Sequence, residues 1–233
     1  MIVEVKAILY YLFTEMKYSL IIFWSIFLSS IILLFILSDL VLRNVIISTS
    51  LATYVFCTII GFLITKKNLP FCIRFGATRN SFHLSVSLFL VLLSIGLAII
   101  NQTVTSFILT MKNQLTIEGI MIYEPAKLLM ESPSWGSSIL IDSIIIFLVL
   151  TIGYFLGSIV YRFGQLGGII TLTSVLLINF LPFIQDGLKV FVKGFANGEM
   201  GVNFLLLMIL SLILLFINSF IIKTASPTPA IAR

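Results

Sequence analysis

The side chains that could do chemistry in this chain are few and far apart. His83 is the only histidine, and the serine cluster Ser137 and Ser138 lies more than fifty residues further along. A serine nucleophile needs a base within about 3.2 Å, and zinc hydrolysis needs about three protein ligands, usually including paired histidines. His83 and the serine cluster are expected at opposite membrane surfaces, about 30 Å apart. The sequence therefore predicts no catalytic residue and no enzyme activity.

Motifs for binding nucleotides or metals are also absent from the sequence. No G-x-x-x-x-G-K-[ST] phosphate loop occurs, so this chain is not expected to bind ATP itself. The two cysteines, Cys57 and Cys72, have no metal-ligand spacing and are expected to stay reduced. We therefore predict no cofactor and no metal site in this chain.

Polar residues within the apolar runs are the remaining candidates for a site. Asp142 stands near one end of its run, and Asn179 and Asn218 stand within theirs. A charged residue in a membrane helix costs about 2.5–3.5 kcal/mol on insertion scales, so it usually faces water or protein. We interpret Asp142 as facing an outer vestibule or lying at the interface, and the two asparagines as lining a substrate path or bonding between helices.

Composition fixes the environment in which these residues must work. Hydrophobic residues make up 60% of the chain, charged residues 10%, and the mean hydropathy is +1.20. Such a chain cannot form a water-soluble globule without large exposed apolar patches. Its runs are apolar on all sides, whereas barrel strands alternate. An all-α integral membrane protein is predicted.

Runs of about 20 apolar residues are the unit that crosses a bilayer. We predict a single transmembrane domain over 1–233 with six spans, at residues 18–38, 45–65, 83–106, 138–161, 167–183 and 202–222. Residues 1–17 carry an apolar stripe that suits a helix lying in the membrane interface. The alternative is that residues 1–17 simply extend the first span.

The distribution of Lys and Arg sets the expected orientation, because cytoplasmic loops are richer in both. With both termini cytoplasmic, the inner segments hold nine cations: Lys6, Lys17, Lys66, Lys67, Arg74, Arg79, Arg162, Lys223 and Arg233. The outer segments hold five: Arg43, Lys112, Lys127, Lys189 and Lys193. Both termini are therefore predicted to be cytoplasmic. The net charge of +5 then points to anionic lipid headgroups and not to nucleic acid.

The inner segment 66–82 is unusually basic and aromatic for a connection between two spans. We expect Asn68 to cap a short helix with Pro70 in its first turn. Gly76 would end that helix in the left-handed conformation, and Thr78 would cap the next span. A helix, a glycine corner and a second helix are the predicted shape. The aromatic side chains would either dock a partner or anchor the segment in the interface.

Glycines recur at fourfold spacing near the end of the fourth span and the turn that follows it. Gly153 and Gly157 form one pair, and Gly164 and Gly168 form another. Such spacing is typical of helices in close contact. The contact is either within this chain or between two chains.

Two stretches carry a resemblance to a known family. The string Leu69-Pro70-Phe71-Cys72-Ile73-Arg74-Phe75-Gly76-Ala77-Thr78-Arg79-Asn80-Ser81-Phe82, between the second and third of six spans, is similar to a loop of ABC-2 type transporter permeases of Gram-positive bacteria. The stretch from Gly153 to Gly168 looks like the turn between the fourth and fifth spans in the same family. The six-span plan and the chain length match as well. One departure is the outer segment of about thirty residues before the fourth span, which contains Pro125 and Pro133.

The resemblance implies the membrane subunit of an ATP-driven exporter in the bacterial plasma membrane. Two permease chains, identical or homologous, would pair, and separate subunits would bind ATP and Mg. Residues 68–75 would form the coupling helix, and residues 184–201 would form outer re-entrant helices. The residues implied in docking the ATP-binding subunit are Leu69, Phe71, Ile73, Arg74, Phe75, Gly76 and Arg79. A hydrophobic or amphipathic cargo, such as an antimicrobial peptide, is expected because the spans hold few charges.

A non-catalytic membrane sensor or immunity protein that binds a peptide or lipid is the alternative. It would share the helical bundle and the basic segment. Co-purification separates the two hypotheses, because a sensor should bring down no ATPase.

Overall fold

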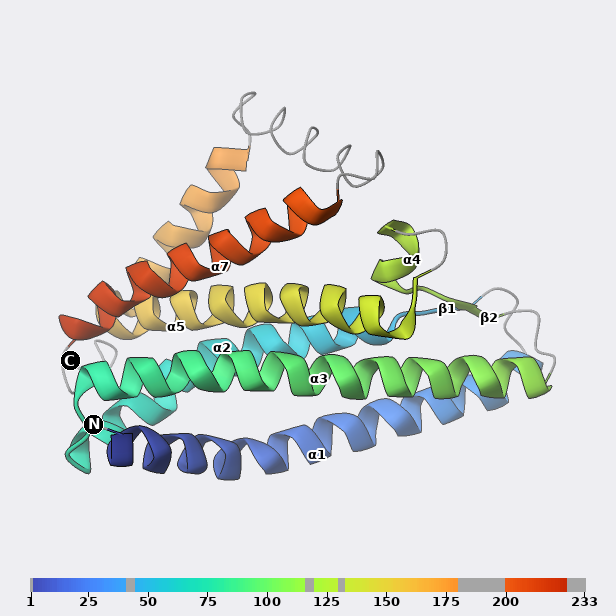
Figure 1. The fold of residues 1–233 in the computed structure, drawn as a ribbon, viewed down its shortest axis with the longest axis horizontal. Helices are drawn as coiled ribbons and strands as arrows, with labels where there is room; N and C mark the ends of the chain where they lie inside the picture. Colours follow the sequence, from blue (N-terminus) through green and yellow to red (C-terminus); the bar gives the residue numbers. More distant parts are fainter. Residues whose placement is uncertain (1, 41–44, 116–119, 130–132, 180–199, 226–233) are drawn as a thin grey trace.

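The computed structural model describes residues 2–40, 45–115, 120–129, 133–179 and 200–225, which form a helical bundle (Figure 1). Its long helices are α1 (Ile2–Leu40), α2 (Thr49–Arg74), α3 (Arg79–Leu115), α5 (Trp135–Asn179) and α7 (Met200–Lys223). Five helices within the described residues are long and apolar enough to cross a membrane. The predicted helical class is confirmed, and the five helices are compatible with a multi-pass membrane protein.

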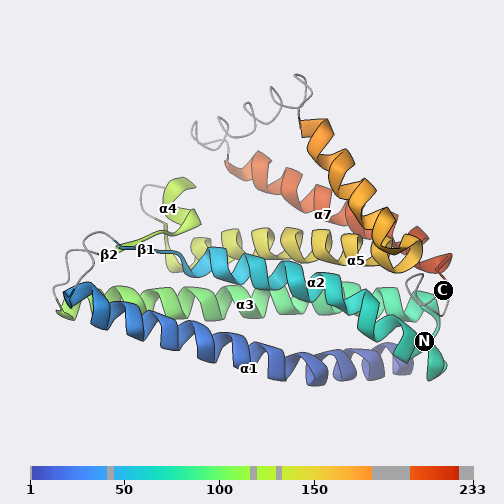
Figure 2. The same cartoon turned by 180° about the vertical axis from the view of Figure 1, so that it is seen from behind.

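The count of five differs from the predicted six because α5 holds both the predicted fourth span and the described part of the fifth, on either side of a bend. Gly164 has φ 75° and ψ −172°, which interrupts the helix between the predicted fourth and fifth spans. The segment after the bend leaves the bundle at an angle (Figure 2). Only residues 167–179 of the predicted fifth span are described, and they belong to α5. Residues 180–183 of that span lie outside the described residues, as do residues 184–199 of the predicted re-entrant helices.

The first helix is longer than expected. α1 runs without interruption from Ile2 to Leu40, so the boundary expected after Lys17 is not marked by a break. Residues 2–40 contain neither glycine nor proline, and nothing in the local sequence ends the helix there. The continuity favours residues 2–17 as an extension of the first span. Their position relative to the membrane plane stays a prediction.

α1 and α3 run from one end of the bundle to the other, and α2, the part of α5 before its bend and α7 run back, which defines two ends (Figure 1). At the end that we call the corner end, Ser81 donates a 2.7 Å hydrogen bond to Glu4, and Arg79 donates one to the carbonyl oxygen of Lys223. The starts of α1 and α3 and the end of α7 therefore lie together. Whether this end faces the cytoplasm stays a prediction.

The opposite end, here the strand end, carries elements that the all-helical prediction did not include. Strand β1 (Val45–Ile47) pairs in parallel with β2 (Ile120–Ile122), and the short helix α4 (Pro125–Leu129) follows. α3 continues to Leu115, so the outer connection, which was expected to begin at residue 107, is shorter than predicted. The strands tie the start of α2 to the segment that leads into α5.

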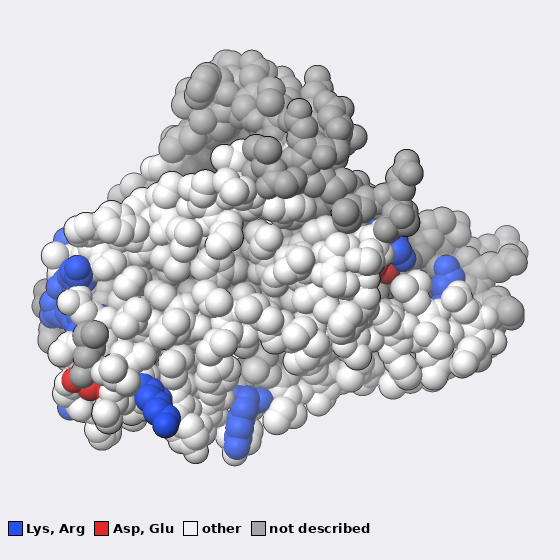
Figure 3. Space-filling view, in the orientation of Figure 1, with Lys and Arg blue, Asp and Glu red and all other residues white. Residues whose placement is uncertain are grey.

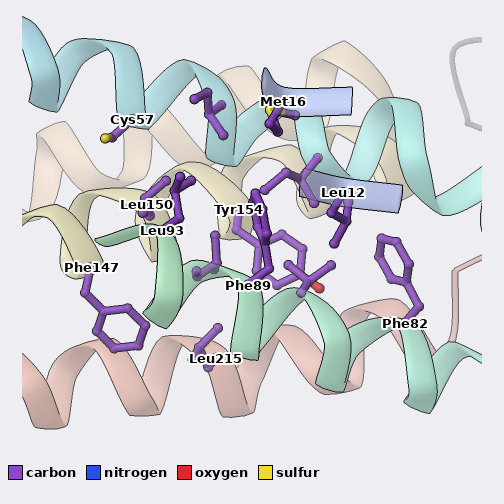
Figure 4. Packing of buried hydrophobic residues seen from close by; sticks show 14 of the residues in the cluster. Leu12, Met16, Cys57, Phe82, Phe89, Leu93, Phe147, Leu150, Tyr154 and Leu215 are labelled. Atoms are coloured by element: carbon purple, nitrogen blue, oxygen red, sulfur yellow. The ribbon is translucent and has the colours of Figure 1, made fainter. Parts of the chain in front are cut away.

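Large apolar side chains from all five long helices fill the centre of the bundle (Figure 4). Tyr154 of α5 and Phe89 of α3 are fully buried within it. α2 and α5 approach most closely, because a Cβ added to Gly153 would lie 2.4 Å from the Thr58 carbonyl oxygen. One added to Gly61 would lie 2.4 Å from the Leu150 carbonyl oxygen. The two backbones are therefore in direct contact, and we call this contact the α2–α5 seam.

Candidate functional site

The turn between α2 and α3 has the glycine corner that the sequence predicts. Gly76 has φ 85°, and its N–H donates a 3.0 Å hydrogen bond to the Ile73 carbonyl. The Ala77 N–H donates one of 3.0 Å to the Cys72 carbonyl, so the last carbonyls of α2 are satisfied. Thr78 accepts a 3.1 Å hydrogen bond from the Ser81 N–H and caps α3. The chain reverses within a few residues.

The expected coupling helix is not a separate element. α2 continues through Pro70 to Arg74, so residues 68–74 are its last turns. Asn68 does not cap a helix start: it is fully buried within α2, and neither side-chain amide atom has a hydrogen-bond partner among the described residues. Leu69 is fully buried as well. Both side chains face the bundle, so Leu69 is not available for docking in this conformation.

The exposed part of the corner is smaller than the implied docking set. We call Phe71, Arg74, Phe75 and Gly76 the corner surface, and all four are exposed. Phe75 is 77% exposed, whereas Phe71 is 41% exposed and stacks on Tyr11 of α1 at 4.6 Å between ring centroids.

The remaining docking candidates are less accessible. Ile73 is partly buried, and Arg79 is partly buried and bonded to α7. A cavity of about 270 Å³ lies between the corner and the start of α1, lined in part by Ile8, Phe71 and Phe75. The corner surface is therefore an exposed aromatic and basic edge beside an apolar hollow.

A buried polar cluster lies toward the strand end of α2, α3 and α5. Asp142 is only 4% exposed. The Tyr54 hydroxyl donates a 2.7 Å hydrogen bond to its Oδ1 atom, and the Asn101 Nδ2 atom donates one of 2.7 Å to its Oδ2 atom. Ser50 donates a longer one of 3.4 Å to Oδ2. Thr53 joins through a 3.5 Å hydrogen bond to the Asn101 Oδ1 atom. We call these five residues the Asp142 cluster.

Local sequence explains why three of the five residues come from α2. Ser48 caps α2 by accepting a 3.3 Å hydrogen bond from the Leu51 N–H, which starts the helix at Thr49. Residues 50, 53 and 54 are then three or four apart, so they share one face of the first turns. Sequence reasoning named Asp142 but missed this face. The sequence did contain a signal for it, because hydroxyl residues stand at helical spacing at the start of this apolar run.

The remaining candidates are dispersed. Asn218 is fully buried on α7, and neither of its side-chain amide atoms has a partner among the described residues. Asn179 is the last residue of α5, and its side chain lies outside what the structure describes. His83 lies near the start of α3, where its Nδ1 atom is 3.3 Å from the Tyr154 hydroxyl oxygen. Ser137 and Ser138 begin α5 at the other end.

The four glycines have three different environments. Gly153 and Gly157 both pack on α2: a Cβ at Gly157 would lie 2.3 Å from the Phe62 carbonyl oxygen. Gly164 forms the bend in α5, and a Cβ at Gly168 would meet Val160 of the same helix and no other described residue within 4 Å. The first pair therefore packs within this chain.

Comparison of the chain with protein-family models, curated proteins and solved structures finds no match in any of the three. In the part of the chain that the structure describes, no group of three His, Cys, Asp or Glu side chains could hold a metal ion. The corner surface and the Asp142 cluster, at opposite ends of α2, are thus the two features from which function is argued.

Proposed function

We propose that this chain is a transmembrane permease subunit of an ATP-binding-cassette exporter, and that a separate ATP-binding subunit docks on the corner surface. The observation that carries the proposal is the exposure of Arg74 and Phe75 at the turn joining α2 to α3. Two membrane-length helices meet at this turn, so a force applied to it would move both. The resemblance of residues 69–82 to ABC-2 type permeases supports the same function.

The distribution of charge supports a cytoplasmic corner end, the side on which ATP is available. Among the described residues, eight cations lie on the segments nearer the corner end: Lys6, Lys17, Lys66, Lys67, Arg74, Arg79, Arg162 and Lys223. Lys112 and Lys127 lie nearer the strand end. Figure 3 shows basic side chains at the corner end and along the lower edge, with others toward the strand end, beside a broad uncharged middle. This asymmetry agrees with the rule that cytoplasmic segments are richer in Lys and Arg.

The sequence has no phosphate loop, so in this proposal ATP and Mg are bound by the partner subunit. A second copy of this chain, or a homologous permease, would complete the path across the bacterial plasma membrane. Hydrophobic or amphipathic molecules, including peptides, are the proposed cargo. Long exposed apolar faces on α1 and α7 suit such cargo as well as lipid.

The test compares two double variants at the same end of the bundle. R74E/F75A changes the corner surface, whereas R162E/F163A changes an exposed Arg–Phe pair beside the bend in α5. Because binding energy concentrates in a few aromatic and arginine anchors, R74E/F75A should reduce co-purification of the ATP-binding subunit at least tenfold. R162E/F163A should leave it within about twofold. Phe71 is left intact because its loss would also remove the stack on Tyr11.

Equal co-purification by R74E/F75A and the native chain, with both well inserted, would contradict docking at the corner. A native chain that co-purifies with no ATPase would favour the alternative function, a membrane sensor or immunity protein.

A further inference from the structure

The negative charge of an ionised Asp142 is not balanced by the residues that bond to it. Its carboxylate is buried in a membrane-length helix and accepts hydrogen bonds from an amide and two hydroxyl groups. These donors are neutral. Across the described residues the one ion pair between side chains joins Lys127 to Glu124 at 2.7 Å, and Asp142 takes no part in it. Hydrogen bonds satisfy the lone pairs of a carboxylate, but they leave its net charge in place.

The first turns of α2 favour the ionised form of Asp142. Ser50 and Tyr54, which both bond to the carboxylate, belong to the N-terminal turns of that helix. The partial positive charge at a helix N-terminus amounts to about half an elementary charge. It therefore offsets part of the negative charge. A buried charge that is not fully balanced is costly in a membrane, and such residues usually mark ion or substrate sites.

The cluster gathers the atoms that an alkali cation prefers. Besides the two Asp142 oxygens, the Ser50 and Thr53 hydroxyl oxygens and the Asn101 side-chain oxygen take part in one hydrogen-bonded group, with successive distances of 2.7–3.5 Å. Hard cations select carboxylate, carbonyl and hydroxyl oxygens. One carboxylate balances one positive charge. We propose that the Asp142 cluster binds a monovalent alkali cation, with Asp142 as the charged ligand.

Binding requires one local rearrangement. The Asn101 Nδ2 atom now faces Asp142 and Ser50, while its Oδ1 atom faces Thr53. A half-turn of the amide exchanges two groups of nearly equal size and brings the oxygen beside the carboxylate. The cation then links α2, α3 and α5 at the strand end. It stabilises the bundle there by mass action, because it binds the folded state.

The experiment measures thermal unfolding of the purified full-length protein in detergent, with NaCl, KCl or choline chloride at constant ionic strength. Sodium or potassium should raise the midpoint in a saturable way, by about 5 °C or more at saturation. Asp142→Asn should lose the response, and in choline chloride it should be at least as stable as the native chain, because it removes the unbalanced charge.

A second pair of variants keeps the charge and changes one oxygen. Thr53→Val removes a hydroxyl of the cluster and should move the half-saturating concentration about tenfold higher. Thr103→Val is the matched control: Thr103 bonds to the carbonyl four residues before it, as Thr53 does, but is exposed on α3. It should not change the response.

Equal midpoints in sodium, potassium and choline would overturn the proposal. So would an unchanged response in both Asp142→Asn and Thr53→Val. A midpoint that depends on pH but not on the cation would also overturn it, since Asp142 would then be balanced by a proton. The cation proposal does not depend on the docking of an ATPase. Its success or failure therefore does not affect the test of docking at the corner surface.

Discussion

α2 meets its two flanking helices in opposite ways. Against α5 it packs backbone to backbone, with Gly61 on one helix facing the region around Gly153 on the other. Against α1 it packs through aromatic rings, with Phe23 stacked on Phe56 at 4.1 Å and Tyr11 stacked on Phe71 at 4.6 Å. In the most apolar stretch of α1, 6% of the residues are buried, whereas in the most apolar stretch of α2 the share is 44%.

The comparison indicates that the contact between α2 and α5 is fixed, whereas the contact between α1 and α2 is adaptable. Without a hydrophobic driving force between helices in lipid, close packing of small residues supplies the association energy. The α2–α5 seam has such packing, and it can be disturbed by a single methyl group. The ring contacts of α1 leave most of that helix on the surface, where lipid or another chain can cover it. Substitutions at the two contacts should therefore change stability by very different amounts.

The largest effect is expected at the seam. Gly153→Ala places a Cβ 2.4 Å from the Thr58 carbonyl oxygen, and neither helix can yield without moving its backbone. We expect a loss of about 3 kcal/mol in stability, measured by thermal unfolding in detergent. Gly96→Ala on α3 is the control, because among the described residues a Cβ there has no neighbour within 4 Å. It should be neutral or stabilising by up to about 1 kcal/mol, since alanine favours helix. Equal stability of the two variants would show that the seam is not in backbone contact.

A smaller effect is expected at the corner, where α2 passes into α3. Gly76→Val meets no atom of the described residues within 4 Å of its Cβ, but it forces a branched residue to φ 85°. A left-handed conformation costs about 1–2 kcal/mol for residues with a Cβ. Gly136→Val, also without neighbours but with no positive φ, should change stability by less than about 0.5 kcal/mol. A Gly76→Val variant as stable as this control would mean that the corner readily adopts another backbone.

Sequence predicted those features that depend on local chemistry. The glycine corner at Gly76 and the Thr78 cap follow from residue types that suit a left-handed exit and a helix start. The end of α2 was predicted wrongly because a local signal was misleading. Asn68 and Pro70 suggested a new helix, yet α2 runs through both because residues on its inner face, including Leu69, remain buried in the bundle.

The Asp142 cluster could be predicted only in part. Asp142 and Asn101 stand out as polar residues in apolar runs, but their pairing with Tyr54 joins residues 88 positions apart. That pairing depends on the rotation of α2 about its axis, which the seam fixes through Gly61 and Gly153. Helical spacing shows that Ser50, Thr53 and Tyr54 share a face. It does not show which neighbour that face meets.

The smallest effect is expected at the contact between α1 and α2, and it requires a double-mutant cycle. Phe23→Ala and Phe56→Ala each remove one ring of a pair that is nearly parallel, with 7° between the ring planes. The coupling energy should be about 0.5–1.5 kcal/mol, the usual range for aromatic pairs. Phe216 and Phe220 on α7 form the control: they lie four residues apart on one exposed helix face, so their coupling should not exceed about 0.5 kcal/mol. A Phe23–Phe56 coupling near zero would mean that these rings do not hold α1. Its attachment would then depend on the other contacts, among them the stack of Tyr11 on Phe71, the hydrogen bond between Ser81 and Glu4 and the edge contact of Phe13 with Phe89.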